Sequence, residues 1–478
     1  MPNRKSILND RKRTALAVAA LACTILTAAG HTARAQQNPP ADSATAAMER
    51  EFQAALAAQD KGDLDRAESL LRDLHTHHPG IFQVDETLGL LLVSRGNVAG
   101  ALPLLQSAVR EQPSSDVAHA NLGAAYYQLH RAKPALEEFE RAVEINPRNA
   151  SAQESLGRIS IENQRPEEAA KALLAAQRLK PDDQDLKLDC ITALLAANRL
   201  GDAQKMLSTV AGADQSARAQ SLLGEADEKA GKFQQAGEHF ARAVALEPSE
   251  ENAWQMSLEL LRHWTFDAAI IEFQAASAKF PDSKRLRLGL GAALFGDAKY
   301  AQAVPVFADL LESDPDNTTY AELLGIACNA PLSTSNPRCS MLVTYAQAHP
   351  ADARAATYAA GFLLTESDNQ QNVALARQLL VRAITANPGM PEAQYQMGVV
   401  LQQSNDWKGS IPYLERAIKL KPDFAQAHYH LARAYWRVGR REDGQAQMEM
   451  QKKYARQEQD DLNRRLSQIA TLGVEVKQ

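Results

Sequence analysis

The sequence has few cysteines and none of the common catalytic motifs. Four cysteines among 478 residues are too few for a disulfide-dense scaffold. No CxxC pair, HExxH helix, GxSxG elbow or Walker loop occurs, so the usual signatures of metal, serine-hydrolase and nucleotide sites are missing. We therefore expect no enzyme activity and no cofactor. An enzyme with a site assembled between distant segments stays the less favoured alternative.

An excess of basic residues is also missing. Lys and Arg number 52 against 58 Asp and Glu, which gives a formal net charge of −6. Nonspecific nucleic-acid binding needs clustered cations that displace phosphate counterions. The charge balance therefore argues against a nucleic-acid partner, while a hydrophobic content of 45% is ordinary for a folded protein.

One long apolar run is present, and it lies near the N-terminus. Basic residues 11–13 precede the apolar residues 14–30, and Ala-Arg-Ala at 33–35 places small residues where a signal peptidase reads them. This pattern predicts a signal peptide over residues 1–35 and an exported protein, periplasmic or secreted. The alternative is an uncleaved N-terminal anchor, although the run is short and alanine-rich for a spanning helix.

Proline recurs along the chain at a fixed interval. The same spacing of 34 residues separates successive members of three series, which are Pro79, Pro113, Pro147 and Pro181; Pro281 and Pro315; and Pro388 and Pro422. A fixed period near 34 indicates a repeat architecture, in which each unit is one small helical motif. Proline ends a helix because it lacks an N–H group and clashes with the preceding turn.

The residues between the prolines repeat as well. If Pro147 is position 32, its unit begins at Asp116. Large residues then stand at positions 7, 11 and 24, and small ones at positions 8, 20 and 27: Leu122, Tyr126, Phe139, Gly123, Ala135 and Ala142. Five other units match this pattern in phase. The pattern resembles that of the tetratricopeptide repeat family, and the resemblance extends over about twelve units.

The resemblance implies an all-α fold, a right-handed α-solenoid of about twelve antiparallel helix-turn-helix repeats. We expect a flexible lead over residues 36–47, the solenoid over residues 48–455 and a capping helix over residues 456–478. Glycine at position 8 lets the two helices of a repeat approach, and stacked neighbours bury the face that one hairpin leaves open. The alternative for the last segment is a coiled-coil seam of a homodimer.

In this family the first helix of each repeat lines a concave groove that holds peptides or protein segments. The groove positions of the last two full repeats are occupied by Tyr395, Gln402, Tyr429, Arg433 and Trp436. Aromatic and arginine side chains are enriched among residues that dominate binding energy. We predict that these five residues bind a partner. The alternative is that their rings pack against the C-terminal helix as part of the cap.

Two special uses of the family groove are absent by residue type. Glu86 and Leu90 occupy positions where a carboxylate clamp needs Lys and Asn. An asparagine ladder at position 6 is represented only by Asn121. The sequence therefore indicates neither binding of a peptide's terminal carboxylate nor a sugar-transferase role.

The cysteines predict one disulfide. Cys328 lies late in a predicted first helix, and Cys339 follows across an irregular turn. Antiparallel helices can bring them within bonding range in an oxidising compartment. The alternative is two free thiols. Cys190 stands at a buried leucine position and is interpreted as a core residue, while His75, His77 and His78 are interpreted as solvated rather than metal-binding.

The prediction for function is a non-catalytic scaffold of the cell envelope that binds a protein segment in its concave groove. No metal, cofactor or nucleic acid is expected. The alternatives are a structural homo-oligomer joined through the C-terminal helix, or an enzyme with a site between repeats.

Overall fold

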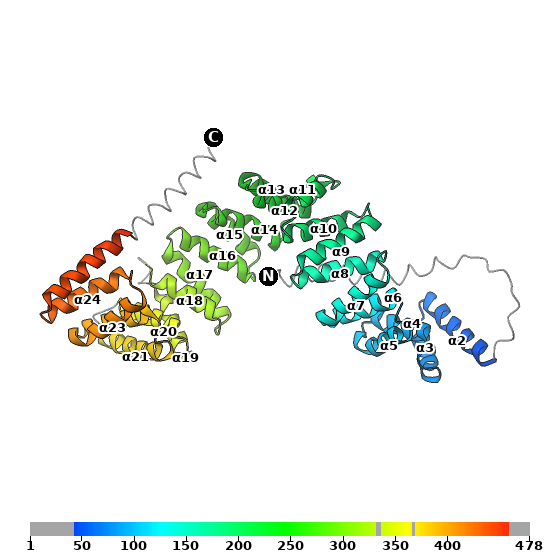
Figure 1. Cartoon of the computed structure of the whole chain (residues 1–478), viewed down its shortest axis with the longest axis horizontal. Helices are drawn as coiled ribbons and strands as arrows, with labels where there is room; N and C mark the ends of the chain where they lie inside the picture. The colour runs from blue at the N-terminus through cyan, green and yellow to red at the C-terminus, as the bar shows by residue number, and fades with distance from the viewer. Residues whose placement is uncertain (1–42, 331–335, 366–368, 458–478) are drawn as a thin grey trace. The chain divides into compact units, whose positions relative to one another are not determined.

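The computed structural model describes residues 43–330, 336–365 and 369–457, and these residues form helices and turns without a strand. The signal peptide predicted over residues 1–35 and most of the C-terminal segment 456–478 lie outside them. The chain divides into two units, Met1–Leu246 and Glu247–Gln478, which are described one at a time (Figure 1).

The first unit contains twelve α-helices among its described residues. They are α2 (Ser43–Asp60), α3 (Leu64–His77), α4 (Phe82–Ser94), α5 (Val98–Glu111), α6 (Asp116–Gln128), α7 (Ala132–Ile145), α8 (Ala150–Glu162), α9 (Pro166–Leu179), α10 (Gln184–Ala196), α11 (Leu200–Leu207), α12 (Ala217–Lys229) and α13 (Phe233–Leu246), with a 3₁₀ turn η2 (Ala213–Gln215).

The second unit continues the same alternation of helices. Its elements are α14 (Glu250–Arg262), α15 (Phe266–Lys279), α16 (Lys284–Gly296), α17 (Tyr300–Ser313), α18 (Thr318–Cys328), η3 (Pro337–Cys339), α19 (Ser340–Ala348), α20 (Ala353–Leu363), α21 (Gln370–Ala386), α22 (Pro391–Gln403), α23 (Trp407–Leu420) and α24 (Ala425–Arg437). Residues 441–457 form one more helix.

The described helices pair in chain order into twelve hairpins, six in each unit. This confirms the predicted all-α repeat fold. Two expected boundaries differ from the structure. Helix α2 begins at Ser43, inside the segment 36–47 expected to be a flexible lead, and its alanine-rich sequence favours a helix there. The helix 441–457 also runs without a break across the expected boundary at residue 456.

Each hairpin begins and turns at residues of defined chemistry. The first helix of most repeats starts after a Ser, Asn or Asp whose side chain accepts a hydrogen bond from the backbone N–H three residues on, as Ser115 does from Ala118. Position 15, in the turn between the two helices, has a positive φ. Glycine takes it in four repeats, and His130 or Ala298 in others. The expected prolines follow the second helices, as Pro147 follows α7.

The core of a repeat depends on one close approach between its helices. A Cβ atom built on Gly123 in α6 would lie 3.1 Å from the ring of Phe139 in α7. The same relation joins position 8 to position 24 in other repeats, for example Gly224 to Phe240 at 2.8 Å. A side chain at position 8 would therefore overlap the large residue that fills the hairpin.

In four repeats, a buried polar residue at position 4 contacts the preceding repeat. It hydrogen-bonds the carbonyl oxygen of the proline that closes the preceding repeat; such pairs are His119–Pro113 at 3.2 Å, Gln153–Pro147 at 3.2 Å, Gln394–Pro388 at 3.4 Å and His428–Pro422 at 2.9 Å. A buried polar group requires a partner. These bonds supply one and fix the stacking distance between repeats.

No helix among the described residues is long and apolar enough to cross a membrane.

Candidate functional site

The five residues predicted to line the groove fall into three environments. Tyr395 on α22 and Gln402 at its end are engaged within the protein. The ring of Tyr395 packs against Phe424 with centroids 4.9 Å apart, and burial raises the pKa of its hydroxyl. Gln402 is buried and donates from Nε2 to the carbonyl oxygen of His430 at 2.9 Å. These two residues hold α22 against α24 and leave little surface for a partner.

Tyr429 and Arg433 belong to the outward face of α24. Tyr429 is 41% exposed, and the guanidinium of Arg433 lies over its ring, with Cζ 5.7 Å from the centroid. Arg433 also lies 5.5 Å from the ring centroid of Trp407, at the start of α23. Such cation–π contacts hold the guanidinium in place while it keeps contact with solvent.

Sequence reasoning missed two members of this surface. Trp407 belongs to a second helix, and Arg437 stands one helical turn after Arg433 at a position the family pattern does not assign to the groove. In the structure Arg437 Cζ lies 5.1 Å from the Trp407 ring centroid. The recurrence of arginine at an interval of four on α24 was the available signal. We name Trp407, Tyr429, Arg433 and Arg437 the arginine–aromatic ladder.

Trp436 has a different environment from the ladder. It is 40% exposed, yet its indole lies against Gly444 of the helix 441–457, where a Cβ atom would come within 2.5 Å of Cδ1. Gly444 holds position 20, which is alanine in the regular repeats. Trp436 therefore packs on the C-terminal helix, which is the arrangement expected of a cap residue.

His430 lies behind the ladder and stays neutral at ordinary pH. Burial, followed by the positive charge of Arg433, lowers the pKa of its imidazole to about 4. Its Nδ1 lies 2.8 Å from Oε1 of Gln402. The neutral imidazole holds the Gln402 side chain in place and adds no positive charge next to Arg433.

Cys328 and Cys339 form a disulfide in the structure. Their Cα atoms are 5.7 Å apart, and both residues are fully buried. The bond joins the end of α18 to η3, across the irregular turn. Cys190 is a free thiol with no exposed surface, and burial raises its pKa to about 12, so it cannot act as a thiolate nucleophile.

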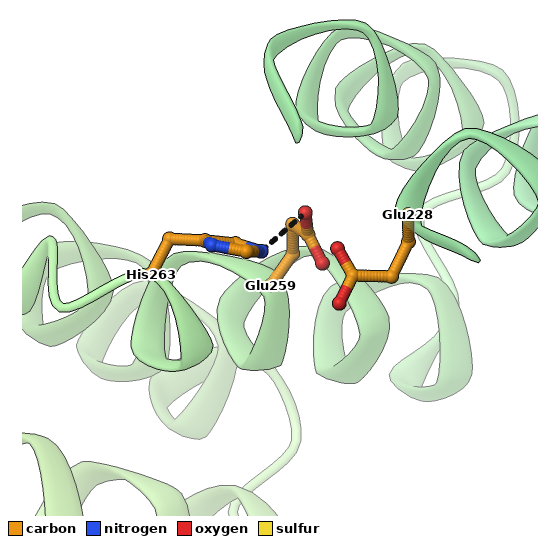
Figure 2. A group of neighbouring side chains, drawn as sticks. All are labelled: Glu228, Glu259 and His263. Carbon is orange, nitrogen blue, oxygen red and sulfur yellow. Dashed lines mark ion pairs between the residues drawn. The ribbon is translucent and has the colours of Figure 1, made fainter. Parts of the chain in front are cut away.

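Other ionisable groups are used in local pairs. The side chain of His75 keeps 38% of its surface exposed, and its Nδ1 lies 2.6 Å from the buried carboxylate of Asp85. His77 bonds the carbonyl oxygen of Asp73 in its own helix. On α14, His263 Nε2 lies 3.2 Å from Oε1 of Glu259, an ion pair drawn in Figure 2.

Comparison with protein families identifies the class. Models described as tetratricopeptide repeat match residues 52–116, 92–159, 160–226 and 265–326, and one described as TPR repeat matches residues 401–439. Together they cover more than half of the chain. The protein belongs to the tetratricopeptide repeat family, whose members are repeat scaffolds that bind protein partners.

Individual relatives are similar over shorter stretches. The type IV pilus assembly protein PilF of Pseudomonas aeruginosa is 36% identical over 91 residues, which are 19% of this chain and 36% of that protein. The chain thus spans about a third of this relative's length. Among solved structures, YrrB, described as a TPR protein with an unusual peptide-binding site, is 20% identical and covers 38% of this chain and 94% of its own, with a TM-score of 0.36. MamA is 20% identical, and the match covers 39% of this chain and 95% of the MamA chain, with a TM-score of 0.32.

Proposed function

We propose that this protein is a non-catalytic scaffold of the cell envelope that binds a segment of a partner protein in its concave groove, at the exposed side chains of α24. The observation that carries the proposal is the ladder. Its rings and guanidiniums are ordered by contacts with one another, yet Tyr429 keeps 41% of its surface exposed. Exposed aromatic and arginine side chains held in one geometry bury much area at a small entropic cost.

Export and a role in assembly are part of the same proposal. The N-terminal pattern over residues 1–35 supports export, and so does the Cys328–Cys339 disulfide, since such bonds persist in oxidising compartments. The partial likeness to a pilus assembly protein supports placing the scaffold among envelope-assembly, secretion or polysaccharide-export complexes.

Two variants of α24 test where the partner binds. The full-length tagged chain, expressed in a bacterium that exports it, is used to capture partners, which are counted by quantitative mass spectrometry. Tyr429→Ala should weaken the captured partner's affinity by about 2 kcal/mol, roughly 30-fold, with an unchanged melting temperature. Trp436→Ala is the matched control: it should lower the melting temperature and leave capture unchanged, because Trp436 packs on Gly444.

The same preparation tests export. The N-terminal residue of the purified protein should be Gln36, and the protein should fractionate outside the cytoplasm. An intact chain beginning at Met1 in the soluble cytoplasm, or capture that survives Tyr429→Ala but is lost in Trp436→Ala, would overturn the corresponding part of the proposal. A homo-oligomer joined at the C-terminal helix would instead appear as self-capture, with a doubled mass in light scattering.

A further inference from the structure

The ladder places two guanidiniums on one indole ring. Arg433 and Arg437 lie one helical turn apart on α24, with Cζ atoms 5.5 Å and 5.1 Å from the Trp407 ring centroid. The ring is itself held, because Trp407 Nε1 donates to Oδ1 of Asn405 at 2.6 Å. The two charges are therefore fixed in position before any ligand arrives.

Neither charge is neutralised within residues 43–330, 336–365 and 369–457. Arg433 and Arg437 make no hydrogen bond or ion pair there, and α24 contains no Asp or Glu. The nearest acidic side chain in sequence to Trp407, Asp406, is engaged as the N-cap of α23 and accepts from the N–H of Gly409. Like charges one turn apart on a helix repel each other. An anion bound between them removes that cost and gains bidentate hydrogen bonds.

Resting on the proposed function, we infer that the partner segment is acidic: carboxylates of a partner protein bind Arg433 and Arg437, while an apolar or aromatic residue of the same segment packs on Tyr429. The chain as a whole has a net charge of −6, so the ladder is a local positive site on a negative protein. Nonspecific nucleic-acid binding draws on many phosphate contacts along an extended cationic surface, whereas this site offers two guanidiniums on one ring. A short acidic peptide segment matches two guanidiniums and the exposed ring of Tyr429.

The test compares two peptides on the purified full chain. One fluorescein-labelled probe alternates glutamate and glycine on either side of a central phenylalanine, and the other carries glutamine in place of every glutamate. Fluorescence anisotropy at low salt should give at least tenfold tighter binding of the acidic probe. The Arg433→Gln/Arg437→Gln double variant should bind both probes with the affinity that the wild type shows for the glutamine probe.

Matched controls separate charge at the ladder from charge elsewhere. Arg377→Gln removes an exposed arginine on α21 and should leave the affinity for the acidic probe unchanged. The single variant Arg437→Gln, at an exposed position, replaces the double variant if circular dichroism shows that the latter does not fold. Raising the salt concentration should weaken the acidic probe and spare the glutamine probe.

Several outcomes would overturn the inference. Equal binding of the two probes, no binding of the acidic probe, or unchanged affinity in the double variant each contradict an acidic partner. If both probes bind equally and both are lost in Tyr429→Ala, the proposed function stands and only the acidic character is wrong. A length-matched single-stranded oligonucleotide that binds as tightly as the acidic probe, and is lost in the double variant, would replace a protein partner with a nucleic acid.

Discussion

Two hairpins of this protein fill the space beside the glycine of their first helix with residues from different helices. In α6–α7, the space beside Gly123 is filled by Phe139 from the second helix of the same repeat. In α18–α19, the space beside Gly325 is filled by Tyr358 from α20, the first helix of the next repeat. Helix α19 contains only nine residues, and the disulfide links α18 to Cys339, the residue just before α19.

The difference shows what the repeat requires. Helices can approach at a glycine only if something large fills the adjacent volume, but the filling residue need not come from the partner helix. Where the second helix is short, a neighbouring repeat supplies the ring, and a covalent bond holds the short helix in place. The regular hairpin fills the volume beside its glycine from its own second helix, whereas the irregular one fills that volume from the next repeat and carries a disulfide.

The largest expected effect breaks the regular hairpin. Phe139 is 3% exposed, so Phe139→Ala should destabilise the protein by about 3–5 kcal/mol through lost burial and a cavity. Leu342 stands eight residues before Pro350, as Phe139 stands before Pro147, and it is fully buried, so Leu342→Ala should cost about 2–5 kcal/mol although the ring beside Gly325 comes from Tyr358. Urea unfolding followed by circular dichroism measures both. A loss of less than about 1 kcal/mol for Leu342→Ala would show that α19 adds little to the packing of its hairpin.

The second prediction concerns the disulfide. Replacing Cys328 and Cys339 by serine should cost about 2–3 kcal/mol, since the bond closes a loop of eleven residues. Reductant should lower the stability of the wild type by a similar amount. It should not destabilise the double serine variant further, because Cys190 is already a free thiol. Mass mapping of the non-reduced protein should recover the two cysteines as one linked peptide. Recovery of both thiols in free form would contradict the bond.

Two glycines of the hairpin α12–α13 differ in the space around them, and they test whether the close approach of the two helices requires glycine. Gly224→Ala should cost about 1–3 kcal/mol, because the new Cβ atom would lie 2.8 Å from the ring of Phe240. Gly237→Ala, in the middle of α13 with no atom within 4 Å of the new Cβ, should instead stabilise by about 0.5–1 kcal/mol. Thermal melting of the two variants should therefore move in opposite directions. If the melting temperatures of both variants shifted in the same direction, the space around each glycine would not explain the effect of its substitution.

The smallest expected effect lies in the turn between helices. Regular hairpins turn through a residue with positive φ, and Ala298 holds that position between α16 and α17 with φ 56°. Its side chain is exposed and forms no core contact, so Ala298→Gly should stabilise by about 1 kcal/mol through relief of the left-handed backbone. Differential scanning calorimetry resolves such a shift. Destabilisation would mean that glycine's unfolded-state entropy outweighs the strain.

The predictions from sequence were strongest where the chain repeats itself. The prolines, the Leu-Gly pairs and the small residues at positions 20 and 27 define the hairpins, because each residue type has one physical role at its position. The predictions for individual groove residues were weaker. Family position alone grouped Tyr395 and Gln402 with Tyr429, although the first two are committed to contacts inside the protein.

Sequence by itself determined the fold class, the phase of the repeats and the family, because proline and glycine constrain the backbone locally and periodicity reports burial. Only the tertiary structure decided which aromatic rings stay available. Trp407 and Arg437 come from positions that no groove pattern includes, and Arg433 and Arg437 both lie over the Trp407 ring because α23 and α24 pack side by side. Trp436 looks like an anchor in the sequence, yet Gly444, eight residues further on, leaves the space that turns it into part of the cap.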